Sequence, residues 1–314
     1  MTVSQIFSRK RLLSKSQTGC MLLAACAVVM PSLVMAQSPE ADEGTPASFP
    51  SAAPCPDASE WPEGMACVEG GVFERGNDEG RPAERPARGV YVDTFYMELH
   101  EVTNEEYEEC IRSRECERPM PFRRFRRPQQ PAVAMSWFDA VNFCERLGRR
   151  LPTEAEWERA ARGPDNTLYP WGNEERTCEA ANVSDRSHGG RGCGRDVTRD
   201  VGSYPAGHWG LFDMAGNVHE WVSDWHSDCY EGCDNACGES CEGVNPQGPC
   251  DGAARCSGYY LREVRGGSWY WELRHARATA RRGSGAPNRG PHRFGFRCAQ
   301  SIERGVSAPQ GGEQ

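Results

Sequence analysis

Three segments of the chain combine a helical spacing of apolar residues with an N-terminal capping pattern. In each, a Thr or Ser is followed three residues later by an acidic residue: Thr103 and Glu106, Ser136 and Asp139, Thr153 and Glu156. Apolar residues then recur on one helical face: Tyr107, Cys110 and Ile111 in the first segment, and Trp137, Ala140, Val141, Cys144 and Leu147 in the second. Gly148 and Gly163 end the second and third segments. The pattern predicts three short amphipathic helices.

The other apolar residues occur in shorter runs. The run 89–97, GVYVDTFYM, is typical of a β-strand, and long stretches rich in Gly, Pro, Asn and Asp separate such runs. We therefore expect an α+β domain with much irregular structure. Because long loops need to be fastened, we also expect disulfides or bound cations.

The first 36 residues have the pattern of a secretory signal. Basic residues at positions 9, 10, 11 and 15 precede an apolar run over 19–34, and the segment ends in the small-residue sequence Val34-Met35-Ala36. We expect cleavage after Ala36 and an exported protein, periplasmic or extracellular. A lipoprotein box at 23–26 is the alternative, favoured less because only about seven apolar residues precede its cysteine. No later run approaches the length of a membrane span, so the mature protein is not expected to cross a membrane.

Composition divides the rest of the chain. Residues 37–54 are rich in Pro, Ser, Ala and acidic side chains and are expected to form a disordered linker, with a second disordered tail at 304–314. Residues 55–303 are long enough for a single domain, which we expect to be monomeric. Removal of the signal takes away four basic and no acidic residues, so the formal charge changes from −9 to −13. Nucleic acid is therefore not an expected partner.

Cysteine is abundant in the exported part. Fourteen of the sixteen cysteines follow Ala36, an even number that favours disulfides over metal thiolates in an exported chain. The run CYEGCDNACGESC places Cys229, Cys233, Cys237 and Cys241 at a spacing of four, which could also suit a metal cluster. Its acidic, Gly-rich composition and the exported address favour disulfides, with Cys250 and Cys256 as further partners. The sequence leaves the pairing of these six open.

Eight sequence blocks together resemble one protein family. In order, they are GGVFERG, YMELHEVTNEEY, PAVAMSWFDAVNFCERLGRRLPTEAEWERAARG, YPWGNE, ANVSD, GLFDMAGNVHEW, VRGGSW and HRFGFRCA. Their order and spacing over residues 65–300 are similar to those of the formylglycine-generating enzymes, also called sulfatase-modifying factors. The resemblance implies one domain with a C-type-lectin-like topology, little regular structure and structural calcium. It also implies a disulfide between Cys144 and Cys298.

A calcium site is expected in the block GLFDMAGNVHEW. The carboxylates of Asp213 and Glu220 and the carbonyls of Gly216 and Val218 surround a Gly-containing turn, and such oxygen ligands suit calcium. The spacing alone is equally consistent with an acidic surface loop, but the resemblance places calcium ligands at these four positions. It also places a second calcium at Asn182 and the carbonyl of Val183. The acidic ligand of that second site is not matched cleanly, because Cys193 stands where the resemblance places an aspartate, and only Asp196 is near.

The resemblance also shows what is missing. Formylglycine-generating members bind copper through two cysteines that follow the RGGS block by three and eight residues, and these positions hold Trp271 and Ala276. Soft thiolates suit monovalent copper, so copper is not expected here. Rescue by Cys256 would require a free thiol in an oxidising compartment. A further bridge of some members would join the positions of Ala161 and Arg281.

Other candidate chemistry centres on histidine and arginine. Ser268 is retained from the family pattern, and His219 replaces a tryptophan that members often carry. His219 and His226 do not have zinc-protease spacing, and no His-x-x-x-His-x-Glu iron set occurs. His219 and His275 could form an acid/base pair if the fold brings them together. The arginines of this region are expected to be ion-pair partners of acidic residues, or to hold an anionic ligand: Arg274, Arg277, Arg281 and Arg282.

Two functions are consistent with these features. The first is an exported binding or accessory module that holds a peptide or protein client, or a small anionic ligand, without turning it over. The second is an oxidoreductase or protein-modifying enzyme that uses other residues on the same fold, similar to the periplasmic members that mature a siderophore. A residual formylglycine activity would have no chemical basis in these residues.

Overall fold

The computed structural model describes residues 49–120, 122–228, 230, 239–283 and 285–302. These described residues form one compact unit. The expected signal, the tail at 304–314 and most of the run with Cys229, Cys233 and Cys237 lie outside the described residues. Residues 49–54, at the end of the expected linker, have no regular secondary structure, and the carbonyl of Ala53 accepts a hydrogen bond from Thr94.

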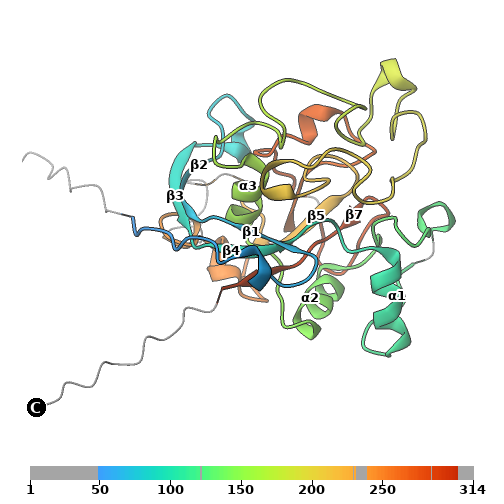
Figure 1. Cartoon of the computed structure of the whole chain (residues 1–314), viewed down its shortest axis with the longest axis horizontal. Helices are drawn as coiled ribbons and strands as arrows, with labels where there is room; N and C mark the ends of the chain where they lie inside the picture. The colour runs from blue at the N-terminus through green and yellow to red at the C-terminus, as the bar shows by residue number, and fades with distance from the viewer. Residues whose placement is uncertain (1–48, 121, 229, 231–238, 284, 303–314) are drawn as a thin grey trace, which may run out of the picture. The chain divides into compact units, whose positions relative to one another are not determined.

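The three predicted helices are present, each with its capping box. They are α1 (Asn104–Arg112), α2 (Trp137–Arg146) and α3 (Glu154–Arg162), which begin directly after Thr103, Ser136 and Thr153 (Figure 1). The predicted inner face of α2 is correct except at its end. Leu147 is 41% exposed, because it follows the last helical turn and no longer lies on the inner face, whereas Phe143 is buried in its place.

The strands form three small sheets. The first has the order β1-β4-β8 and contains Met65–Val68, Phe95–Glu98 and Ala299–Ser301. The second pairs β2 with β3, Gly71–Arg75 with Arg88–Val92. The third places β5 between β6 and β7, with bounds His219–Trp225, Arg262–Arg265 and Phe294–Gly295. The predicted strand 89–97 is therefore two strands of different sheets, because Asp93 binds the side chain of Asn245 and interrupts the run.

The core packs the helices against these sheets. Trp157 of α3 is fully buried in the larger apolar cluster, together with residues of β1 to β4. A second cluster joins α1 and α2, in which the Tyr107 and Phe143 rings stack with centroids 5.6 Å apart. Within the described part of the chain, no helix has the length and apolar character needed to cross a membrane.

Disulfides fasten the irregular segments. The predicted pair Cys144–Cys298 is confirmed and links α2 to the residue before β8. The other pairs are Cys55–Cys67, Cys110–Cys116, Cys178–Cys193 and Cys250–Cys256. Cys241 is also disulfide-bonded, so every cysteine that the structure describes is oxidised. Cys256 is therefore not a free thiol that could replace the missing copper ligands.

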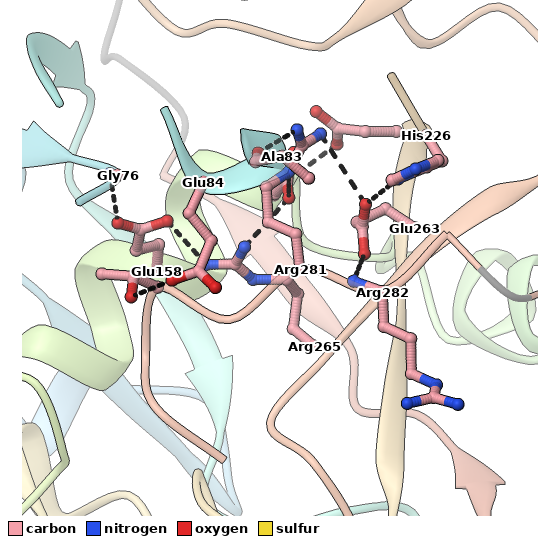
Figure 2. A network of polar contacts seen from close by, with 12 residues as sticks. Gly76, Ala83, Glu84, Glu158, His226, Glu263, Arg265, Arg281 and Arg282 are labelled. Carbon is pink, nitrogen blue, oxygen red and sulfur yellow. Dashed lines mark hydrogen bonds and ion pairs between the residues drawn. The ribbon is translucent and has the colours of Figure 1, made fainter. Parts of the chain in front are cut away.

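A buried ionic network anchors the segment after β6. Arg265 binds Glu154 and Glu158 of α3, with N–O distances of 3.0 and 2.6 Å. Arg281 also binds Glu154, and its guanidinium lies 3.7 Å from Glu263. Figure 2 shows Glu158, Glu263, Arg265 and Arg281 of this network close to one another. The network holds both ends of the segment 266–280 in place, and this segment carries the expected site.

Candidate functional site

Three buried carboxylates lie beside the loop that precedes β5. Glu101, Asp213 and Glu220 are 0%, 7% and 0% exposed. Glu220 accepts hydrogen bonds from Nε and Nη2 of Arg297 at 2.8 and 2.7 Å. Glu101 accepts a hydrogen bond of 2.7 Å from the side-chain amide of Asn217. The structure thus brings the two predicted calcium-binding carboxylates into one polar cluster with a third acidic residue.

The pKa values show that these carboxylates repel one another. Burial, followed by the charges of Asp213 and Glu220, raises the pKa of Glu101 well above its ordinary value. Burial also raises the pKa of Asp213 to about 6, although the Gly202 N–H and Arg297 lower it. Three carboxylates share the single charge of Arg297, so the cluster keeps a negative excess. This donor set could hold a hard cation such as calcium.

Glu101 was not among the predicted ligands. It precedes the Thr103 cap by two residues and lies more than one hundred positions from Asp213, so no local spacing relates them. The block YMELHEVTNEEY contains the residue, but its pattern predicts only a helix start. Only the three-dimensional structure shows that Glu101 is fully buried next to Asp213 and Glu220.

The loop backbone has an unusual shape. Asp213, Gly216 and Asn217 all have positive φ, at 57°, 86° and 52°. Gly216 approaches the neighbouring chain so closely that a Cβ on it would lie 2.6 Å from the carbonyl oxygen of Asn182. The N–H of Asn217 donates to that same oxygen at 2.9 Å. The two segments predicted to bind calcium are therefore in direct contact.

The second predicted calcium site is less complete. The Oδ1 atom of Asn182 is buried without a hydrogen-bond partner, as a cation ligand would be. The carbonyl of Val183, however, accepts a hydrogen bond from the N–H of Cys193, and that cysteine is bonded to Cys178. Asp196 forms an exposed ion pair with Arg124. The structure thus brings Asn182 and Val183 together without adding a free carboxylate from Asp196.

Trp271 and Ala276 occupy the positions that the resemblance assigns to copper ligands. The Trp271 ring lies 5.3 Å from the His275 ring, and the guanidinium carbon of Arg282 lies 4.0 Å from the Trp271 centroid. Ala276 is fully buried against Gly267, where a Cβ on the glycine would lie 2.8 Å from the alanine Cβ. Both positions are thus filled by packed, unreactive side chains.

Several polar atoms of this region are buried without partners. His219 is 1% exposed, and neither ring nitrogen has a hydrogen-bond partner. The Ser268 hydroxyl and the indole N–H groups of Trp269 and Trp271 are also unpartnered. Buried polar groups are normally satisfied, so such a concentration marks a place where a ligand or water is expected.

Burial and nearby positive charges lower the pKa values of both candidate histidines. Burial, then the charges of Arg282, Arg293 and His275, lowers the pKa of His219 well below its ordinary value. Burial, then nearby arginines beginning with Arg81, lowers the pKa of His275 to about 4. The fold therefore places both imidazoles in one positively charged region, where they are neutral at pH 7.

The arginines of this region divide into two groups. Arg274, Arg277 and Arg281 bind Glu272, Glu84 and Glu154, as expected for ion-pair partners. The same expectation is wrong for Arg282. Its backbone N–H binds Glu263, but its side chain extends away from the network in Figure 2 and has no carboxylate partner among the described residues. It lies instead over the Trp271 ring.

The eight blocks, the disulfide and the acidic loop all occur within one sequence match. Residues 50–302 match the family model described as "Sulfatase-modifying factor enzyme 1-like domain". The chain belongs to this family. Its α+β fold, with three helices and small sheets, is the one that the resemblance implied.

The relatives of this sulfatase-modifying factor domain include a protein named as a kinase, one named as a formylglycine-generating enzyme and one named as inactive. The chain is 33% identical to the serine/threonine-protein kinase pkn1 of Chlamydia pneumoniae, over 76% of this chain and 38% of that protein. The chain thus spans about two fifths of the length of such kinase relatives. It is 29% identical to the formylglycine-generating enzyme of Bos taurus, over 82% of this chain and 79% of that protein. It is 27% identical to the inactive Cα-formylglycine-generating enzyme 2 of Mus musculus, over 76% and 86%.

A solved structure shows the same fold. PvdO from Pseudomonas aeruginosa superposes with a TM-score of 0.60 at 26% identity, over 76% of this chain and 94% of that one. The sulfatase-modifying factor fold thus accounts for the arrangement of the described strands and helices.

Proposed function

We propose that this chain is an exported, calcium-stabilised binding or accessory module of the sulfatase-modifying factor family that does not form formylglycine with copper. One observation carries the proposal. The two positions that the resemblance assigns to copper-binding cysteines hold Trp271, which packs against Arg282 and His275, and Ala276, which packs on Gly267. An indole and a methyl group cannot bind a soft metal ion.

The state of the other cysteines supports this proposal. All eleven cysteines in the described part of the chain are disulfide-bonded, so none supplies a thiolate nearby. Five disulfides also suit an exported protein. A mouse relative named as inactive is compatible with a family member that binds without this oxidation.

The carboxylate cluster supports structural calcium. Glu101, Asp213 and Glu220 would supply hard oxygen ligands, and the carbonyls of Gly216 and Val218 lie in the same loop. Calcium supplies the positive charge that Arg297 alone does not. Its role would be to hold the loop before β5 in position. A second calcium at Asn182 and Val183 is a weaker part of the proposal, because Val183 already accepts a backbone hydrogen bond.

The alternative is an enzyme that uses other residues of the same site. Two observations favour it: His219 and His275 lie close enough for their charges to interact, and a relative at 29% identity is named a formylglycine-generating enzyme. In that case a neutral imidazole could exchange a proton with a substrate. The module without turnover is our preferred proposal, because all cysteines among the described residues are disulfide-bonded and none offers a free thiolate.

Metal and thiol analysis of the purified mature protein tests the proposal. We expect bound calcium, no stoichiometric copper or iron, and no thiol that titrates under native conditions. A cysteine-containing peptide incubated with the protein, copper(I) and oxygen should form no aldehyde. Aldehyde formation, or a stoichiometric redox metal that persists after dialysis, would overturn it. A His219→Gln and His275→Gln pair then separates the two functions: if turnover of any client is found and both changes abolish it, the enzyme alternative is correct.

A further inference from the structure

The unpartnered atoms around Trp271 are mostly hydrogen-bond donors. Four of them can only donate: the indole Nε1 atoms of Trp269 and Trp271, and the Nε atoms of Arg282 and Arg293. The Ser268 hydroxyl and the His219 ring can donate as well as accept. A ligand that satisfies this set must therefore supply several acceptor atoms.

The charged groups of this region also favour an acceptor ligand, because they are mainly positive. Among the described residues, no carboxylate binds Arg81, Arg282 or Arg293, although the chain as a whole has a formal charge of −9. Arg81 instead contacts a neutral ring, with its Nη2 atom 3.1 Å from Nδ1 of His275. Two acidic residues of this region bind other arginines, since Glu84 pairs with Arg277 and Glu272 with Arg274. Within the part of the chain that the structure describes, no ion pair to a carboxylate compensates the positive charge of Arg81, Arg282 and Arg293.

Aromatic rings hold two of these guanidinium groups in place. Arg282 lies 4.0 Å above the Trp271 ring, and Arg293 lies 5.7 and 5.6 Å from the Tyr270 and Phe294 centroids. Stacking on a ring restricts a guanidinium while leaving its edge free to donate. Less side-chain freedom is then lost when a ligand binds.

The groups can also be reached from solvent. Arg81 is exposed, and Trp271, His275, Arg282 and Arg293 are only partly buried. Below them, His219 and Ser268 are fully buried. The site thus combines the buried polar side chains of His219 and Ser268 with arginines that solvent can reach.

We propose that this site binds an oxyanion, a carboxylate or a sulfate or phosphate group, held by Arg81, Arg282 and Arg293. The inference rests on the proposed binding function and gives it a ligand class. A cation would be repelled, and a neutral ligand would leave the three guanidinium charges uncompensated. An oxyanion supplies both negative charge and several acceptor atoms in one group.

Titration calorimetry with simple ions tests this proposal. Sodium sulfate, inorganic phosphate and sodium acetate are titrated into the wild-type protein and into Arg282→Gln, Arg293→Gln and Arg176→Gln, at constant ionic strength set with sodium chloride. Arg176 is the matched control, because it loses the same charge but forms an exposed ion pair with Glu179 elsewhere. We expect saturable binding that weakens by at least about tenfold in the first two variants and is unchanged in the control. Melting curves confirm that each variant is folded.

The ions also distinguish the sources of the oxyanion. Preference for acetate, followed by tighter binding of a peptide ending in Glu than of one ending in Gln, supports a client carboxylate. Preference for sulfate or phosphate supports a tetrahedral ester or free ion. Absence of saturable binding, or equal affinity in the wild type, Arg282→Gln and Arg293→Gln, overturns the inference. Such a failure would leave the metal and thiol results unaffected, so it can be separated from failure of the proposed function.

Discussion

Arg281 donates two hydrogen bonds to the carboxylate of Glu154, from Nε to Oε1 at 2.6 Å and from Nη2 to Oε2 at 3.0 Å. In some family members, a further disulfide joins two cysteines at the positions that Arg281 and Ala161 occupy in this chain. Both are buried, with exposures of 4% and 0%. In this chain, the ion pair between Arg281 and Glu154 connects the segment after β6 to α3. In family members with the further bridge, a disulfide would connect the same two segments.

Replacing Arg281 should destabilise the domain strongly. Arg281→Met leaves Glu154 and Glu263 with less compensating charge in a fully buried setting, and such a loss costs about 3–5 kcal/mol. Urea unfolding under oxidising conditions measures the change in free energy of unfolding. The double variant Arg281→Met/Glu154→Gln should recover part of the loss, because it removes a buried negative charge that Arg265 alone would have to compensate.

The exposed ion pair between Arg176 and Glu179 provides the control for these Arg281 variants. Arg176→Met breaks the exposed pair with Glu179, which should cost less than about 1 kcal/mol. If Arg281→Met costs no more than Arg176→Met, or if the double variant recovers nothing, the ion pair does not anchor the segment.

Calcium removal should lower the melting temperature. At a calcium concentration one hundred times its Kd, binding adds about 2.7 kcal/mol to folding stability. For a domain of this size that corresponds to a melting temperature about 5–10 °C higher than with excess chelator. Glu101→Gln should reduce this difference, because Glu101 contributes one of the three carboxylates. Glu60→Gln, at an exposed site, should leave the difference unchanged. A melting temperature that is the same with calcium and with chelator would rule out a structural cation.

Local patterns predicted the helices well because a capping box lies within four residues. Thr103, Ser136 and Thr153 each begin a helix as expected. The strand at 89–97 was predicted less well, because its interruption depends on a bond from Asp93 to Asn245, more than one hundred and fifty positions away. The same limit applies to disulfides: only Cys144–Cys298 was predicted as a pair, and the family resemblance supplied it.

For the candidate site too, the sequence predicted the local features but not the contacts between distant segments. Its position after RGGSW and the loop with Asp213 and Glu220 follow from the sequence blocks. The third carboxylate, Glu101, comes from a distant segment and could not be predicted from spacing. Arg282 was expected to form an ion pair, but charge pairing depends on which groups the fold brings within a few ångströms, and it stacks on Trp271 instead.

The stability of the domain should fall at alkaline pH because of His226. Its Nδ1 atom lies 2.5 Å from Glu263, and Arg281, Glu154 and Asp228 are its other charged neighbours. Burial lowers the pKa of His226, but the charge and hydrogen bond of Glu263 outweigh burial and raise it above its ordinary value.

A raised folded-state pKa means that this interaction stabilises the domain fully below about pH 6.5, the unfolded value. The contribution is lost as pH rises through the folded-state pKa. Urea midpoints measured from pH 6 to pH 9 should therefore fall more steeply in the wild type than in His226→Gln. Equal slopes would show that the His226–Glu263 bond has no such linkage.

Oxyanion binding should be linked to protonation of His275. In the free protein, burial and the charges of Arg81, Arg274, Arg282 and Arg277 lower the pKa of His275 to about 4, so the ring is neutral at pH 5.5. A bound anion would offset these arginine charges and raise that pKa toward its ordinary value. Affinity for sulfate should then increase as pH falls from 7 to 5, with proton uptake on binding.

Calorimetry at pH 5.5 in two buffers of different ionisation enthalpy measures this uptake directly. His275→Gln should bind sulfate with less proton uptake and a flatter pH dependence, since the ring that gains the proton is gone. His188→Gln serves as the matched control and should behave as the wild type. If affinity does not change between pH 7 and 5, or if His275→Gln takes up as many protons as the wild type, the anion does not lie among the arginines that surround His275. That result would contradict the proposed site, which requires Arg81 beside His275 and Arg282 over Trp271.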